Sequence, residues 1–131
     1  MPKLTEFAKI AATLEFTPIG NVSAGFRLDV PFEGTATSDH WDGERPVKGI
    51  DRVTVGPDGV QNLDVTARIG SGKEIVSYQA TGRGTADGGP RELITFETTI
   101  EEFNHLNSSI GCALGTIEKN QLRITVYLIE D

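Results

Sequence analysis

The sequence is poor in the residues that carry many common chemistries. It has one cysteine, Cys112, among 131 residues, which excludes an intramolecular disulfide framework and any zinc or iron–sulfur site with several cysteine ligands. Its two histidines, His40 and His105, lie far apart along the chain and do not form a metal-ligand pattern. We therefore expect no metal site.

Positive charge and long apolar runs are also scarce. Lys and Arg number 12 against 19 Asp and Glu, which gives a formal net charge of −7. Nucleic acids and anionic membranes attract basic patches, so neither is expected as a partner. No apolar run approaches the roughly 18 residues of a membrane span. The stretch from Met1 to Glu6 lacks the apolar core of a secretory signal, which predicts a cytoplasmic protein.

Familiar catalytic and cofactor motifs are missing as well. The chain contains no G-x-S-x-G nucleophile elbow, no phosphate-binding P-loop and no dinucleotide-binding glycine fingerprint. The short run Gly82-Arg83-Gly84 follows a predicted strand and opens no clear helix. The sequence therefore predicts no nucleotide or redox cofactor.

What the chain does contain favours strands and turns. It has nine Val, eleven Ile and fourteen Thr, which are β-branched, together with 15 Gly. Apolar and polar residues alternate with period two in residues 25–33 and 63–69, as in half-buried strands. Further strands are predicted at residues 49–55, 74–81, 93–100, 110–117 and 122–130.

One segment, residues 7–17, fits two structures. Its alternate apolar positions from Ile10 to Phe16 fit a strand, whereas Leu4 and Phe7 share a spacing typical of a helix. We favour the strand because the following segments are strands and no convincing pair of helix caps is present.

Eight or nine short strands at close spacing predict an antiparallel meander within a single domain, residues 1–131. No long helix is predicted to cover a sheet face, so closure into a barrel hides the apolar faces and the edges. We expect an all-β, closed antiparallel barrel, calycin-like or allene-oxide-cyclase-like. One short helix is expected near residues 99–107, with Thr99 as its cap and Phe103 and Leu106 facing inward. A barrel of about eight strands has a lumen that can hold a small ligand.

Several ordered fragments resemble a family of small β-barrels called domain of unknown function 3237. They are Phe32-Glu33-Gly34-Thr35, Gly49-Ile50-Asp51, Pro57-Asp58-Gly59, Leu63-Asp64, Thr95-Phe96-Glu97-Thr98, Leu106-Asn107 and Val126-Tyr127. The resemblance covers about residues 7–130 and implies a barrel with a central cavity, but no settled activity. It implies site residues at Asp51, Asp64 and Asn107. Many members have Trp where this chain has His105, and Arg-Tyr where it has Thr66-Ala67, which implies a different ligand.

Asp51 is the most informative candidate site residue. It is in phase with Val53 and Val55, so it faces the lumen if they do; alternatively, Gly49 shifts the phase and leaves Asp51 on the rim. A carboxyl group in an apolar cavity has a raised pKa and suits general acid or base catalysis. Asp64 shares a strand face with Arg68, opposite the apolar face, which predicts a solvated outer surface. The family resemblance instead implies that Asp64 lies in the cavity with Asp51, as an acid/base pair.

Aromatic and imidazole side chains complete the candidate site. His40 is a candidate catalytic base and Trp41 a cover for a ligand; an exposed loop packed over a barrel end is the alternative. Tyr78, in phase with Val76 and Ala80, is either a core residue or a proton donor to a ligand. Phe96, His105 and Asn107 are further candidate ligand contacts. Cys112, in phase with Ile110 and Leu114, is predicted to be a small buried apolar residue.

Two functional hypotheses follow. The first is a cofactor-independent acid/base enzyme, of isomerase, cyclase, lyase or hydratase type, acting on a small, partly apolar carbonyl compound in the lumen. Barrels of the allene-oxide-cyclase kind offer an analogy at the level of the fold only. The second is a small-molecule-binding or assembly barrel without catalysis. A homodimer with Phe7 and Phe103 at its seam is compatible with both.

Overall fold

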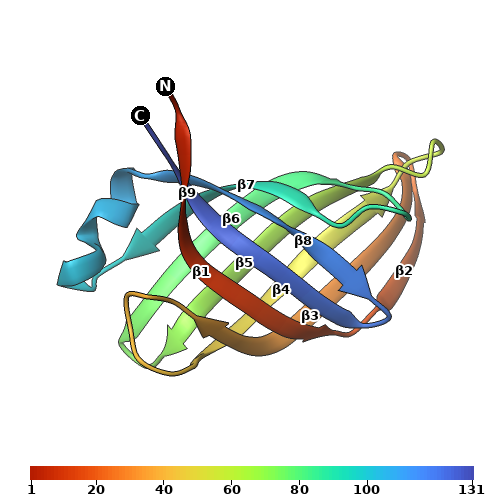
Figure 1. Cartoon of the computed structure of the whole chain (residues 1–131). Helices are drawn as coiled ribbons and strands as arrows, with labels where there is room; N and C mark the ends of the chain where they lie inside the picture. The colour runs from red at the N-terminus through yellow and green to blue at the C-terminus, as the bar shows by residue number, and fades with distance from the viewer.

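The computed structural model, which describes residues 1–131, is one nine-stranded antiparallel sheet that closes on itself (Figure 1). The strands run in the order β1-β9-β8-β7-β6-β5-β4-β3-β2, and β1 also pairs with β3. The ring therefore contains β1 and β3 to β9, and β2 is an extra strand on β3. The elements are β1 (Lys3–Leu14), β2 (Thr17–Val22), β3 (Gly25–Thr37), β4 (Arg45–Val55), β5 (Gln61–Ser71), β6 (Glu74–Gly84), β7 (Arg91–Thr98), the 3-10 helix η1 (Glu101–Ser108), β8 (Ile110–Glu118) and β9 (Gln121–Glu130). The predicted closed all-β barrel is confirmed.

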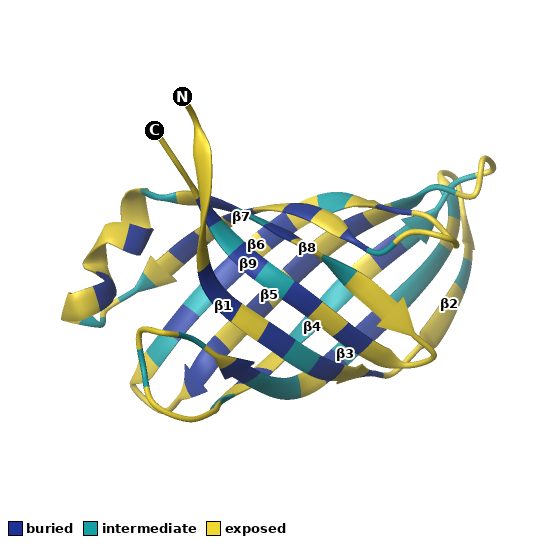
Figure 2. Cartoon of the chain, in the orientation of Figure 1, coloured by how far each residue is buried: buried dark blue, intermediate teal, exposed yellow.

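Period-two alternation builds the core. In β5, the side chains of Leu63, Val65, Ala67 and Ile69 are buried while the residues between them are exposed. The same alternation of buried and exposed residues runs along the other strands of the ring (Figure 2). The inward side chains, with Phe103 and Leu106 of η1, form one cluster of 26 buried residues. Closing the sheet leaves the ring strands without a free edge.

Two departures from the sequence prediction lie at the start of the chain. The strand favoured over residues 7–17 is present but spans residues 3–14, and a register shift between Glu6 and Ala8 turns both Phe7 and Ala8 inward. Leu4 points outward, so it does not share a face with Phe7. Strand β2 was not predicted, because Pro18 and Gly20 interrupt alternation where β2 shifts its register on β3.

Strand β8 faces the opposite way from the sequence prediction. Gly111 and Ala113 are its inward residues near Phe96, and Cys112 lies on the outer face between exposed Ile110 and Leu114. A Cβ atom added to Gly111 would lie 3.0 Å from the Phe96 ring, so the small inward residues make room for that ring. The prediction of a buried Cys112 is therefore wrong.

The helix near residues 99–107 is present as η1, with Phe103 and Leu106 buried as predicted. Its N-cap is Ile100 rather than Thr99, and no side chain caps it. The backbone N–H of Ile100 instead donates to the Thr98 hydroxyl at 3.1 Å. No helix of the chain is long and apolar enough to cross a membrane.

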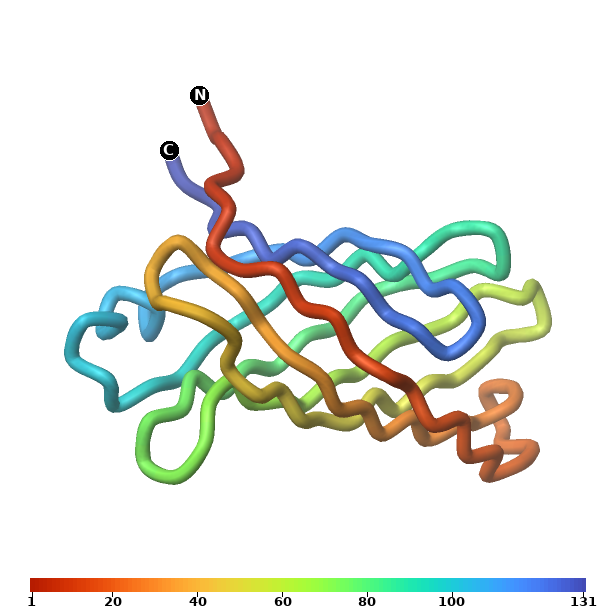
Figure 3. The backbone as a smooth tube through the Cα atoms, turned by 60° about the horizontal axis from the view of Figure 1, so that its bottom comes forward, coloured from red at the N-terminus to blue at the C-terminus, as the bar shows by residue number.

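The two ends of the barrel differ (Figure 3). One end carries η1, the β3–β4 loop (residues 38–44) and the β5–β6 turn; we call it the closed end. The other carries the β2–β3, β4–β5, β6–β7 and β8–β9 connections, and we call it the open end. Both chain termini lie on the side of the closed end.

Candidate functional site

A cavity of about 320 Å³ lies inside the barrel at the open end. Twenty residues line it, thirteen of them hydrophobic. Its mouth is formed by Phe16, Gln61, the β6–β7 loop and Lys119 of the β8–β9 turn, whereas Val65 and Tyr78 lie deeper in the barrel. None of the lining residues comes from the loops of the closed end, so the cavity has a single mouth. Its size is at the lower end of small-molecule pockets, which span roughly 300–1,000 Å³.

Aromatic side chains seal the closed end. The Phe7 ring lies 5.8 Å from Trp41, 6.1 Å from Phe96 and 6.0 Å from Phe103, in each case with the rings steeply inclined. The guanidinium of Arg45 lies over the Trp41 ring, 4.6 Å from its centre. Edge-to-face contacts of this kind stabilise a packed cluster. This cluster separates the cavity from solvent at the closed end.

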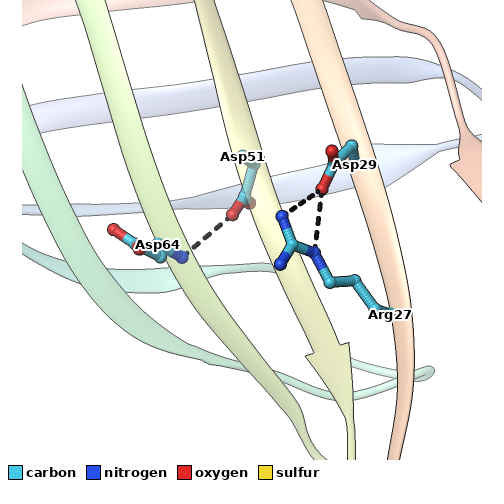
Figure 4. A network of polar contacts seen from close by, with 4 residues as sticks. All are labelled: Arg27, Asp29, Asp51 and Asp64. Atoms are coloured by element: carbon cyan, nitrogen blue, oxygen red, sulfur yellow. Dashed lines mark hydrogen bonds and ion pairs between the residues drawn. The ribbon is translucent and has the colours of Figure 1, made fainter. Parts of the chain in front are cut away.

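Asp51 brings a carboxyl group into the apolar cavity. It lies on β4 in phase with buried Val47 and Val53, so its side chain faces inward. One carboxyl oxygen accepts the backbone N–H of Asp64 at 3.0 Å, where the β4–β5 ladder skips Arg52 and Val53 (Figure 4). Burial raises the pKa of Asp51 from 3.8 to about 6; the Asp64 N–H opposes this shift and the Asp64 carboxylate adds to it.

Glu92 is a second carboxyl group in the same cavity. It lies on β7 in phase with Ile94 and Phe96, and it is the one charged residue of the chain that is buried. Burial, together with the negative charge of Asp51, raises the pKa of Glu92 from 4.5 to about 7. The two carboxyl groups therefore titrate close to neutral pH.

Tyr78, on β6, adds a hydroxyl group. Burial is the main cause that raises the pKa of Tyr78 above its ordinary value, followed by the charges of Glu92 and Asp51. The hydroxyl therefore keeps its proton at neutral pH. Neither Tyr78 nor Glu92 makes a side-chain hydrogen bond. Every side-chain polar atom that is completely enclosed has a hydrogen-bond partner, so the polar atoms of these two residues are not completely enclosed and face the cavity that both residues line. They are available to a ligand.

The strand order places these three groups around the lumen. β4 and β7 are separated by β5 and β6 in a ring of eight strands, so Asp51 and Glu92 project from nearly opposite walls. Tyr78 projects from β6, between them. A ligand in the cavity therefore lies between two carboxyl groups and against one hydroxyl group.

The structure does not bring Asp64 into the cavity. Its side chain is exposed on the outer face of β5, as the strand phase predicts and contrary to what the family resemblance implies. It acts on the site from outside, through the backbone N–H that Asp51 accepts and through its carboxylate charge, which raises the pKa of Asp51. Asp64 forms no ion pair with Arg68 on the same face. The ion pairs present are Arg27–Asp29 (Figure 4) and Lys48–Glu33.

Five other candidate residues lie at the closed end, away from the cavity. His40 is exposed, with its ring 5.5 Å from that of Phe7, and the Trp41 indole N–H donates to the Ala36 carbonyl at 3.3 Å. Phe96 is buried in the aromatic cluster. Trp41 therefore covers the sealed end rather than a ligand.

His105 and Asn107 belong to η1 and make structural contacts. The Asn107 side chain accepts the Thr98 N–H at 2.9 Å and donates to the Thr98 carbonyl at 3.0 Å. These two bonds fasten η1 to the end of β7. His105 is exposed, and its carbonyl accepts the Ser109 hydroxyl at 2.7 Å. Neither residue lines the cavity.

The sequence did not single out Glu92, because the first two residues of the predicted strand, Leu93 and Ile94, are both apolar and point to opposite faces. Leu93 is exposed, whereas Ile94 is buried, and the sequence prediction started the strand at Leu93. Extending the Ile94–Phe96 phase back by two residues would have placed Glu92 inside. No group of three or more His, Cys, Asp or Glu side chains lies together in a way that could hold a metal ion.

Fold and site together define a closed antiparallel β-barrel with a one-mouthed apolar cavity that contains two carboxyl groups. Solved structures share this fold. A protein of unknown function from Clostridium acetobutylicum is 20% identical, covers 99% of this chain and 100% of its own, and superposes with a TM-score of 0.88. A beta-barrel like protein from Acinetobacter baumannii is 17% identical over 99% of this chain and 97% of its own, with a TM-score of 0.84.

An enzyme from Penicillium herquei also has this fold. It is 18% identical over 98% of this chain and 95% of its own, with a TM-score of 0.71. At such identities the likeness shows the fold alone. No family model and no curated protein matches the chain, so the resemblance to domain of unknown function 3237 stays a prediction.

Proposed function

We propose that the protein is a cofactor-independent acid/base enzyme that acts on a small, partly apolar carbonyl compound inside the barrel. The observation that carries this proposal is the pair of carboxyl groups, half-buried Asp51 and buried Glu92, in one apolar cavity. Their pKa values, raised to about 6 and about 7, suit proton transfer near neutral pH. The Penicillium herquei enzyme supports the proposal in that a barrel of this fold is compatible with catalysis.

The two carboxyl groups take opposite roles. Glu92 keeps its proton to the higher pH, so it acts as the acid, and Asp51 acts as the base. Asp51 removes a proton from the carbon beside the ligand carbonyl, while Glu92 gives its proton to the carbonyl oxygen and an enol forms. Tyr78 donates a hydrogen bond to the same oxygen. Return of a proton to a different carbon completes an isomerisation, and loss or gain of water at the neighbouring carbon gives a lyase or hydratase reaction.

A test uses deuterium exchange, which needs no knowledge of the natural substrate. Cyclohexanone, 1-indanone and δ-valerolactone are incubated in D₂O with the protein, and proton NMR follows exchange at the carbon beside the carbonyl. The wild-type protein is expected to accelerate exchange of at least one compound. Asp51→Asn and Glu92→Gln are each expected to lower that rate at least about 100-fold, which is typical for loss of a general acid or base.

The matched control is Asp42→Asn, which makes the same chemical change in the exposed β3–β4 loop at the closed end, away from the cavity. It is expected to leave exchange unchanged. Wild-type rates in Asp51→Asn and Glu92→Gln would remove both groups from the chemistry.

The alternative is a barrel that binds a small molecule without catalysis, which the single-mouthed apolar cavity also favours. In that case the compounds stabilise the protein against heating but exchange at the rate of buffer alone. A ligand at about 100 times its Kd stabilises the fold by roughly 2.7 kcal/mol, so thermal unfolding detects binding independently of exchange.

A further inference from the structure

The outer surface of the barrel is apolar on one side. Leu93 of β7, Ile110, Cys112 and Leu114 of β8, Ile129 of β9 and Leu4 of β1 all point outward. The register joins them: Leu93 pairs with Cys112, and Leu4 pairs with Ile129. We call these six residues the apolar face. Leu93 and Ile110 are 60% and 54% exposed, which is unusual for large aliphatic side chains.

The opposite side of the barrel is polar. The exposed outward residues of β4, β5 and β6 are polar or charged: Lys48, Arg52, Asn62, Asp64, Thr66, Arg68, Gln79, Thr81 and Arg83. Scattered surface aliphatic residues need no explanation, but a contiguous patch on four neighbouring strands does. Such a patch marks an interaction surface.

Charges lie at both ends of the apolar face, with opposite signs. Toward the open end, Arg91 and Lys9 share a row with Leu114 and Thr125, and Arg123 lies one row further. The acidic residue Glu118 lies at the end of β8 on the same side. Toward the closed end the acidic residues Glu97, Glu101, Glu102 and Glu130 follow the apolar residues along β7, η1 and β9, with Lys3 beside Glu130. Glu6 of β1 pairs with Tyr127, in the middle of the face. The face is therefore mainly basic at one end and mainly acidic at the other.

We propose that the apolar face binds a second copy of this chain, related by a two-fold axis near Cys112. The axis lies parallel to the apolar face and perpendicular to β8, so β8 runs antiparallel to β8 of the partner. The basic end of one protomer then lies over the acidic end of the other, and the aliphatic side chains meet in the centre. An interface with two-fold symmetry must be self-complementary. The apolar face meets this condition because its two ends carry mainly opposite charges.

A standard interface buries about 800 Å² on each partner. That is about a tenth of the 8018 Å² of accessible surface of this chain. The seam considered in the sequence analysis is not available, because Phe7 and Phe103 are 1% and 2% exposed and belong to the aromatic cluster.

The test measures the mass of the full chain in solution by sedimentation equilibrium over about 1–100 µM, a range in which a dimer with micromolar Kd dissociates visibly. Wild type is expected to be dimeric at the upper concentrations. Leu93→Glu is expected to raise the dimer Kd at least about 100-fold, because it places a charge in the apolar centre. Gln79→Glu, which introduces the same side chain on the outer face of β6, is the matched control and is expected to leave Kd unchanged.

Charge reversal keeps the proposal testable if Leu93→Glu does not fold. Arg91→Glu is expected to weaken the dimer, and Arg91→Glu combined with Glu97→Arg is expected to restore part of the affinity. The only cysteine of the chain lies near the proposed axis, so mild oxidation is expected to link two chains through Cys112. A monomer at every concentration, or a dimer that Leu93→Glu and Arg91→Glu both leave intact, would overturn the proposal.

Discussion

Asp51→Asn is expected to make the protein more stable at pH 8, with a melting temperature about 5–10 °C above that of wild type. Asparagine has nearly the same shape as aspartate and keeps an oxygen that accepts the Asp64 N–H. It carries no charge, so the cost of burying a carboxylate in the apolar cavity disappears. A shift in pKa from 3.8 to about 6 corresponds to about 3 kcal/mol.

The sign follows from proton binding. The folded chain binds protons at Asp51 and Glu92 more tightly than the unfolded chain, because both folded-state pKa values are raised. The stabilisation from these protons is complete below about pH 4 and declines as pH rises. The stabilisation from the Asp51 proton is lost between pH 3.8 and about 6, and that from the Glu92 proton between pH 4.5 and about 7. Above these windows, each carboxylate destabilises the fold.

The measurement is a set of thermal or urea unfolding curves from pH 4 to pH 8 for wild type and variant. The two proteins are expected to unfold alike at pH 4 and to diverge steadily up to about pH 6. Asp42→Asn, in the exposed β3–β4 loop, is expected to follow wild type throughout. An Asp51→Asn protein that is less stable than wild type at pH 8 would contradict the buried, charged state inferred for Asp51.

Phe103→Ala is expected to lower the free energy of unfolding by about 3–5 kcal/mol, the range for large aromatic side chains removed from a core. The Phe103 ring is 2% exposed and meets Phe7 and Trp41 edge-on at the closed end. It also lies 5.8 Å from the Arg45 guanidinium. Its loss therefore removes buried area and several ring contacts at once.

Urea unfolding measures this change, and Phe16→Ala is the matched control. Phe16 lies at the mouth of the cavity and is 51% exposed, so the same truncation is expected to cost about 1 kcal/mol or less. Equal destabilisation by the two substitutions would show that the aromatic cluster does not seal and support the closed end.

The fold was accessible from the sequence because alternation is a local property. Residues 25–33 and 63–69 alternate cleanly and form strands with the predicted faces. Alternation failed where a distant ring decided the face: Gly111 and Ala113 point inward because Phe96 fills that space. It also failed at β2, where Pro18 and Gly20 break the pattern and pairing with β3 alone holds the strand.

The site was only partly accessible for a related reason. The phase of β4 indicated an inward Asp51, but nothing local distinguishes one end of a barrel from the other. The sequence therefore predicted His40, Trp41 and Asn107 in the same site as Asp51, whereas closure of the sheet places them at the closed end, away from the cavity. To predict that Glu92 faces inward, one must know which of the adjacent apolar residues Leu93 and Ile94 is buried. The arrangement of the whole ring decides this.

The single mouth of the cavity has a kinetic consequence. A molecule that leaves the cavity uses the passage through which the next one arrives, between Phe16, Ile117 and the β6–β7 loop. In the proposed reaction, product and substrate therefore exclude each other, and a bound product delays the next turnover until it has diffused out. The water displaced on binding leaves by that same passage, so widening or narrowing it changes the rates of arrival and release together.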